Sequence, residues 1–364
     1  MTRPRELGIP LGFYGTGRDN SITDVAGVRV GHVTVRQNPR LDGHSDIHSG
    51  VTCIWPHDTW PWDEAVYAAT HVLNGHGELV GITEIAECGL LRSPILLTSS
   101  LSVGIVYDAT ARWAISRDER LARSNFFMPV VTEVSDTILS DNRQFPIVFA
   151  HVEEVLTHCT ASPPLEGAVG AGAGTICYGF KGGIGSSSRI VPCSVGQWII
   201  GALVLTNYGA RRNLTIAGVP VGPAIDLPAE PPSSDGSSIV VLATDAPLLP
   251  HQLRRLALRS SIGLTRSGGF AGHASGEISL AFSTAARVNN ESEPLLDVRL
   301  LRDVANEDVF NAIFEAAVES VNEAVLNSLF QASTTRGRHG RIIHALPVED
   351  TMMLLRRRGV LEGA

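Results

Sequence analysis

The stretch that decides the fold is Asp235-Gly236-Ser237-Ser238-Ile239-Val240-Val241-Leu242-Ala243-Thr244-Asp245. Its second half, residues 239–243, is a short, β-branched apolar run, which indicates a strand buried inside a sheet. The segment before it, residues 223–236, is rich in Pro, Ser and acidic residues and has no apolar periodicity, so it is predicted to be a linker. A core strand that is entered from a linker through a Gly-Ser pair is therefore the feature around which we arrange the rest of the chain.

The Gly236-Ser237 pair suggests a specific chemistry. The hydroxyl of Ser237 can attack the carbonyl of Gly236 and shift the chain from amide to ester, after which water releases a new N-terminus. Glycine permits the strained backbone that this attack needs and leaves its carbonyl open. The freed serine would carry a hydroxyl and an α-amine of ordinary pKa about 7.7–8.0 in one residue. A self-cleaving N-terminal nucleophile hydrolase needs this arrangement, whereas the pair taken alone is more typical of a turn before a strand.

Composition and charge exclude several classes of protein. With 364 residues, the chain can form one large domain or two ordinary ones. A hydrophobic share of 44% against 18% charged residues is typical of an enzyme-like globule rather than a disordered chain. The net charge of -8 and the lack of a basic stripe argue against nucleic acid or an anionic membrane as partner. We interpret the arginines at 356–358 as a solvated helix end.

Cysteine and histidine usage predicts neither a disulfide framework nor a metal site. The cysteines are odd in number and lack CxxC spacing, which favours reduced thiols in a cytoplasm; they are Cys53, Cys88, Cys159, Cys177 and Cys193. His44 and His48 lie in a polar loop with Asp42 and Asp46, and solvated histidines are the favoured interpretation. No signal peptide is expected in the first 20 residues, because they lack an apolar region. The longest apolar stretch is too short to span a bilayer, so we expect a cytoplasmic protein.

Apolar periodicity predicts an alternation of strands and helices. Residues 21–32 are predicted to form strand, turn and strand, with further strands at 51–55, 93–98, 128–133, 195–207, 239–243 and 276–284. Helices are predicted at 63–73, 79–85, 102–115, 146–156, 251–262 and 303–329, with Asp63 as the N-cap of the first. Two sheets with helices on their outer faces explain this pattern, so the predicted architecture is a single αββα sandwich over residues 1–364.

The glycine-rich run at residues 167–174 and the following segment to Arg189 raise the alternative of a phosphate site. No GxxxxGK[ST] motif is present, and the glycines are not placed between a strand and a helix with an acidic residue about 20 positions later. A glycine-rich hairpin whose backbone approaches another element closely is the better interpretation.

Taken together, the motifs resemble a known family. The chain is similar, nearly from end to end, to the DmpA-type peptidases, the L-aminopeptidase/D-esterase-amidase family that also contains the β-aminopeptidases. The motifs that carry the resemblance are Asn20-Ser21-Ile22-Thr23-Asp24-Val25, Asn74-Gly75-His76-Gly77-Glu78, Gly167-Ala168-Val169-Gly170-Ala171-Gly172, Phe180-Lys181-Gly182-Gly183-Ile184-Gly185-Ser186-Ser187-Ser188-Arg189, Ala243-Thr244-Asp245-Ala246-Pro247-Leu248 and Ser275-Gly276-Glu277. Each is weak alone, but their shared order is specific.

The resemblance implies an α/β, four-layer αββα fold like that of DmpA and ornithine acetyltransferase, related to N-terminal nucleophile hydrolases. It implies that a precursor is cut between Gly236 and Ser237 into an α chain, 1–236, and a β chain, 237–364. It also implies a homo-oligomer of processed heterodimers that works without metal or cofactor.

The same resemblance implies the roles of the site residues. Ser237 would be the nucleophile, with Ser275 and Glu277 hydrogen-bonding its new α-amine. Asn207 would donate to the oxyanion, and Glu133 would pair with the free amine of the substrate. Without the resemblance, these residues are more typical of a strand end, a turn serine and two surface acids. A carboxylate stabilises an ammonium, so Glu277 acts through geometry, and the identity of the general base stays open.

The function expected from these observations is a self-processing N-terminal-serine aminopeptidase or amidase. It would release N-terminal residues from short peptides, amides or esters that have a free amine. Residues 134–137 lack the aromatic that relatives often carry after the equivalent of Glu133, which leaves the preference among L-, D- and β-amino acids open. The alternatives are an oligoamide hydrolase or an acyltransferase of the same superfamily, which typically use Thr, and an unprocessed, non-catalytic binding homologue.

Overall fold

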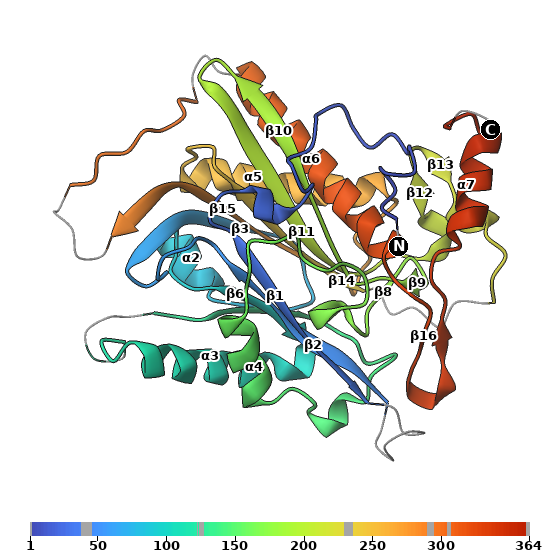
Figure 1. The fold of residues 1–364 in the computed structure, drawn as a ribbon, viewed down its shortest axis with the longest axis horizontal. Coiled ribbons are helices and arrows are strands. Elements are labelled where there is room, and N and C mark those ends of the chain that lie inside the picture. The colour runs from blue at the N-terminus through green and yellow to red at the C-terminus, as the bar shows by residue number, and fades with distance from the viewer. Residues whose placement is uncertain are drawn as a thin grey trace.

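Two mixed sheets lie face to face between two layers of helices (Figure 1). The computed structural model describes residues 2–37, 46–121, 123, 127–228, 236–289, 295–303 and 307–361. His44, Asp42 and residues 229–235 of the predicted linker lie outside these ranges. The predicted four-layer αββα sandwich is confirmed, and among the described residues no helix is long and apolar enough to cross a membrane.

The two large sheets contain five and six strands. The first has the order β1 (Arg29–Gln37), β2 (Ile47–Trp55), β6 (Ile95–Ser99), β7 (Val130–Val134) and β4 (Leu79–Val80). The second has the order β10 (Ile184–Cys193), β11 (Gly196–Asn207), β14 (Ser237–Thr244), β15 (Gly276–Asn289), β3 (Glu64–Gly75) and β5 (Leu90–Leu91). Three two-stranded pairs join β8 (Ile176–Cys177) to β9 (Phe180–Lys181), β12 (Thr215–Ile216) to β13 (Val219–Pro220), and β16 (Thr335–Arg336) to β17 (Ile342–Ile343).

Four of the helices in the described ranges cover the outer faces of the sheets. The α-helices are α2 (Ile82–Cys88), α3 (Val103–Arg117), α4 (Phe149–Thr157), α5 (Pro250–Arg266), α6 (Glu307–Phe330) and α7 (Val348–Arg357). Helices α3 and α4 pack on the five-stranded sheet, and α5 and α6 pack on the six-stranded sheet. A third hydrophobic core fills the space between the sheets. Each helix layer therefore buries one sheet face, and the sheets bury their inner faces against each other.

Strand β14 is buried on both faces. Val240 and Leu242 belong to the core beneath α5 and α6, whereas Ile239, Val241 and Ala243 belong to the core between the sheets. The strand pairs antiparallel with β11 on one side and parallel with β15 on the other. Two-sided burial explains why this strand is a continuous apolar run instead of an alternation of apolar and polar residues.

The helix predicted at residues 63–73 is wrong: this segment is β3, and Asp63 caps no helix there. Val66 and Ala68 lie in the core between the sheets, while Tyr67 and Ala69 pack in the core that contains α5. The side chains thus alternate with the period of a strand. Leu73, whose spacing suggested a helix, is 45% exposed.

Two further predictions need correction. The first strand predicted within residues 21–32 is a 3-10 helix, Ile22–Asp24, because Ser21 and Asp24 form a capping box around its first turn. The helix predicted at residues 79–85 is strand β4 followed, after Gly81, by helix α2. The other predicted strands and helices are present, with ends shifted by a few residues.

The glycine- and serine-rich segments hold neighbouring elements together. The backbones of Gly167 and Ile184 exchange two hydrogen bonds of 2.7 and 2.8 Å, which is the close backbone approach expected of this run. The hydroxyl of Ser186 accepts the N–H of Ile22 at 2.8 Å, and that of Ser187 donates to the carbonyl of Ser320 at 2.6 Å. These segments therefore attach the N-terminal region and α6 to β10.

A buried ion network reinforces the same junction. Arg189 on β10 is fully buried and forms salt bridges of 3.0 Å with Glu319 and 2.6 Å with Glu323, both on α6. Arg5 binds Glu323 from the N-terminal segment at 2.6 Å. The charged ends of Arg189, Glu319 and Glu323 are shielded from water, so they compensate one another, whereas Arg5 stays partly exposed.

We predict that Arg189→Leu lowers the free energy of unfolding by about 3–5 kcal/mol, because it leaves two buried carboxylates without their main cation. The matched control is Arg112→Ala, which removes an exposed pair with Asp108 and should cost about 0.5 kcal/mol or less. Urea unfolding followed by circular dichroism measures both. Equal losses in the two variants would contradict the role given to Arg189.

Candidate active site

Ser237 is the first residue of β14 and lies at the end of the six-stranded sheet. It pairs with Asn207, the last residue of β11, on one side and with Gly276, the first residue of β15, on the other. A Cβ at position 276 would lie 2.4 Å from the carbonyl oxygen of His76 and 3.2 Å from Oγ of Ser237. Glycine at this position therefore keeps space around the serine hydroxyl.

Gly236 occupies a position that only glycine fits. A Cβ there would lie 1.7 Å from the carbonyl oxygen of Asn207 and 2.9 Å from Cα of Tyr208, both of them backbone atoms. The carbonyl of Gly236 accepts a hydrogen bond of 3.2 Å from the N–H of Gly276. The peptide that precedes Ser237 is thus held tightly between β11 and β15.

Ser275 and Glu277 flank the start of β15, next to Ser237. Both side chains are buried, and the hydroxyl of Ser275 donates to the carboxylate of Glu277. The backbone of Glu277 is in register with Ser238 on the neighbouring strand. The structure therefore brings together three of the predicted site residues along one pair of parallel strands.

Asn207 has both ends of its side-chain amide fixed. Its Oδ1 accepts the N–H of Ile176 at 3.0 Å, and its Nδ2 donates to the carbonyl of Ser135 at 2.8 Å. Ser135 directly follows β7, so this amide links the ends of the two sheets. The pairing of β11 with β14 sets the backbone of Asn207 opposite that of Ser237.

Glu133 lies on β7, in the other sheet, and is buried. Its carboxylate accepts hydrogen bonds from the hydroxyl of Ser100 and, at 3.1 Å, from the N–H of Glu78. The segment 74–78 connects β3 in one sheet to β4 in the other, and it passes both Gly276 and Glu133. This crossover places the carboxylate of Glu133 on the Ser237 side of the sandwich.

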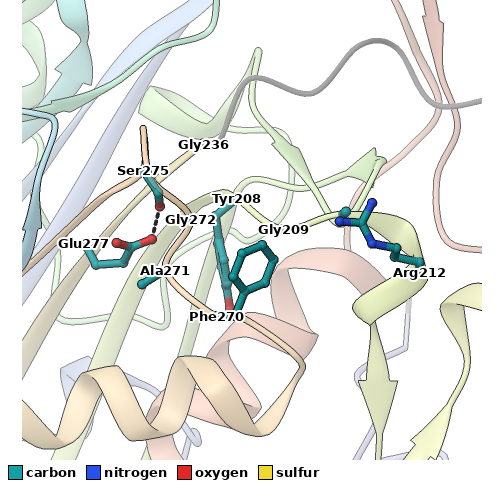
Figure 2. A pocket seen from close by; sticks show the side chains of 10 residues that line it. Tyr208, Gly209, Arg212, Gly236, Phe270, Ala271, Gly272, Ser275 and Glu277 are labelled. Carbon is teal, nitrogen blue, oxygen red and sulfur yellow. Dashed lines mark hydrogen bonds between the residues drawn. The ribbon is translucent and has the colours of Figure 1, made fainter.

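A pocket opens beside Ser275 and Glu277 (Figure 2). Its lining consists of Tyr208, Gly209, Ala210, Arg212, Gly236, Phe270, Ala271, Gly272, Ser275 and Glu277. Asn207 and Glu133 are not among these residues. The pocket thus reaches the peptide at Gly236 from the side of β15.

Residues 20–343 match the model of Peptidase family S58. The chain belongs to this family. It is 37% identical over 372 residues to "Beta-peptidyl aminopeptidase BapA" of Sphingosinicella xenopeptidilytica, covering 98% of this chain and 91% of that protein. Family membership makes the chain a peptide hydrolase.

Solved structures of related proteins share the whole fold. The L-aminopeptidase D-Ala-esterase/amidase of Ochrobactrum anthropi, described as a variant of the Ntn hydrolase fold, superposes with a TM-score of 0.91 at 41% identity and covers 99% of both chains. The β-aminopeptidase of a Burkholderia species gives a TM-score of 0.90 at 41% identity, over 98% of this chain and 99% of that one. These likenesses support aminopeptidase or amidase function in this S58 peptidase.

Sequence reasoning missed the role of Lys181 in this S58 chain. Its side chain is fully buried, and its ammonium donates to the carbonyls of Gly172, Thr175 and Gly182 at 3.0, 2.8 and 2.8 Å. Burial lowers the pKa of Lys181 to about 7. In the peptide group that joins Thr175 to Ile176, the carbonyl accepts from Lys181 and the N–H donates to Oδ1 of Asn207. Lys181 therefore helps to hold the side-chain amide of Asn207 in place. A charged residue inside a glycine-rich, apolar run was the available signal.

Proposed function

We propose that this chain is a self-processing serine aminopeptidase or amidase in which Ser237 is the nucleophile. The observation that carries the proposal is the position of Ser237 at the start of a strand that is buried on both faces. The residue before it is a glycine that no larger residue could replace. The family membership and the Ser275–Glu277 pair beside it support the same assignment.

In the proposed processing step, Oγ of Ser237 attacks the carbonyl carbon of Gly236. The C–O bond forms while the C–N bond breaks, and the hydroxyl proton ends on the α-nitrogen of Ser237. Water then hydrolyses the ester to a carboxylate on Gly236 and a free hydroxyl. The N–H of Gly276, 3.2 Å from the Gly236 oxygen, is a donor for the charge that develops there. The two chains, 1–236 and 237–364, would stay together because β14 and β15 pair with β11 and β3 across the cut.

In the proposed turnover, the same hydroxyl attacks the substrate carbonyl while the freed α-amine of Ser237 moves the proton. Ser275 and Glu277 would hold this amine. A carboxylate beside an ammonium raises the pKa of the amine, so the pair contributes position rather than basicity. Asn207 would donate from Nδ2 to the oxyanion, an interaction worth on the order of 3 kcal/mol of transition-state stabilisation.

Glu133 would pair with the free amino group of the substrate. The carboxylate is buried and already accepts two hydrogen bonds, which leaves acceptor capacity for an ammonium. A substrate that enters without a positive amine would leave a desolvated carboxylate without its cation, at a cost of several kcal/mol. This explains how the site would select N-termini over internal peptide bonds.

We predict that Ser237→Ala abolishes both processing and hydrolysis, because the nucleophile serves in both reactions. A denaturing gel of the wild type should show two fragments, corresponding to residues 1–236 and 237–364, and a gel of the variant should show one band at 38.8 kDa. The control is Ser238→Ala, one position along β14, which should be processed and active. Full activity in Ser237→Ala would refute the nucleophile, and an unprocessed, inactive wild type would favour a non-catalytic binding homologue.

We predict that Asn207→Ala lowers kcat about 10²–10³-fold, because the oxyanion loses a preorganised donor. Steady-state kinetics with an aminoacyl p-nitroanilide measure the loss, and circular dichroism confirms that the fold is retained. An unchanged kcat in a fully processed variant would exclude Asn207 from the oxyanion site.

We predict that acetylation of the substrate amine lowers kcat/KM by at least about a hundredfold, since a desolvated carboxylate would lose its cation. The same comparison of free and acetylated p-nitroanilides in Glu133→Gln should show a much smaller ratio. If the wild type hydrolyses both substrates equally well, Glu133 does not bind the amine.

A further inference from the structure

The pocket beside Ser275 has charges of opposite sign at its two ends. Figure 2 shows the carboxylate of Glu277 at one end and the side chain of Arg212 at the other, with the rings of Tyr208 and Phe270 between them. Phe270 is 56% exposed, so its ring offers apolar surface to a ligand in the pocket. A ligand that extends past Glu277 into this pocket therefore meets an apolar wall and a cation.

The walls of this pocket are fixed by backbone and side-chain hydrogen bonds. Asn74 donates from Nδ2 to the carbonyls of Ala271 and Gly272 at 3.3 and 2.8 Å. On the other side, the N–H of Thr215 donates to the carbonyl of Ser267 at 3.0 Å. The loops that follow β11 and α5 are thus held against each other, so the pocket exists before a ligand binds.

Arg212, which lines the pocket, and Arg211, which does not, have different surroundings. Arg211 donates to the carbonyls of Leu227 and Pro228 at 3.2 and 3.0 Å, and its guanidinium lies 5.2 Å from the ring centroid of Phe180. Arg212 is exposed, lines the pocket, and forms no salt bridge with a carboxylate of the described residues. A guanidinium offers a planar fork of N–H donors that matches a carboxylate. Arg212 is therefore available for an anionic ligand.

The position of the pocket relative to the nucleophile identifies the part of the substrate that it would hold, and this step rests on the proposed function. The pocket is lined by Gly236, the residue joined to the nitrogen of Ser237. After processing, that nitrogen is the amine that protonates the leaving group. Glu133, which would hold the amine of the acyl part, lies on the other sheet and outside the pocket lining. The leaving group would therefore occupy this pocket.

We propose that the pocket is the leaving-group subsite and that Arg212 binds the C-terminal carboxylate of a short peptide substrate. The favoured substrate class is a dipeptide with a free N-terminal amine, a free C-terminal carboxylate and an apolar second residue that packs on Phe270. The amine is bound by one sheet and the carboxylate by the loop after β11, so both ends of the same small molecule are recognised.

The test uses three substrates that share one N-terminal residue and differ in leaving group: phenylalanine, phenylalaninamide and p-nitroaniline. The measured quantity is the ratio of kcat/KM for the acid to kcat/KM for the amide. Arg212→Gln should lower this ratio about tenfold, mainly through KM of the acid, because one charge-assisted contact is lost. Arg212→Lys should give an intermediate ratio. The matched control, Arg266→Gln, removes an exposed arginine outside the pocket and should leave the ratio unchanged.

The outcomes separate this inference from the proposed function. In one outcome, the wild type hydrolyses the p-nitroanilide while the acid-to-amide ratio is the same in the wild type and in Arg212→Gln. This result leaves the proposed function intact and overturns the carboxylate site. An equal loss on acid and amide in Arg212→Gln also overturns it, because a structural role for the arginine would act on both. Failure of the processed wild type to hydrolyse any of the three substrates overturns the proposed function together with the subsite.

Discussion

Burial of β14 on both of its faces is the constraint on which the site depends. A slip of one residue against β11 would move every side chain of β14 into the opposite core, so the pairing register is strongly specified. This register sets Ser237 opposite Asn207 and beside Gly276. The position of the proposed nucleophile at the end of the sheet is thus determined by apolar packing along the strand that follows it.

Two buried cations of this fold, Arg189 and Lys181, are each compensated by several partners. Arg189 has two carboxylates, and the network fastens α6 and the N-terminal segment to β10. Lys181 has three carbonyl oxygens instead, and burial lowers its pKa to about 7. Burial disfavours the ammonium form, so this lysine gives up its proton more easily than a solvated lysine does. Its contact with the peptide behind Asn207 connects the glycine-rich run to the site.

The sequence allowed prediction of the elements whose pattern is local. The core strand of β14 and the long helix α6 follow from apolar spacing alone. The role of the Gly236-Ser237 pair stays a prediction from its chemistry. Strand β3 was mispredicted because its small residues satisfy a helical spacing too, and only pairing with β15 and packing on α5 decide between them. The contribution of Arg212 was not visible, since two loops distant in sequence must meet before it lines a pocket.

The proposed recognition draws on both sheets at once. Glu133 belongs to the five-stranded sheet and Ser237 to the six-stranded one, and the crossover at residues 74–78 joins them. The separation between the carboxylate proposed to bind the amine and the proposed nucleophile is therefore set by how closely the two sheets pack, through side chains such as Ile278 and Val134 in the core between them. Because that core is close-packed and resists compression, the distance from the substrate amine to its scissile carbonyl is selected by the fold as much as by the site residues. Substitutions in this core should consequently change the preference between α- and β-amino acids without touching a reacting group.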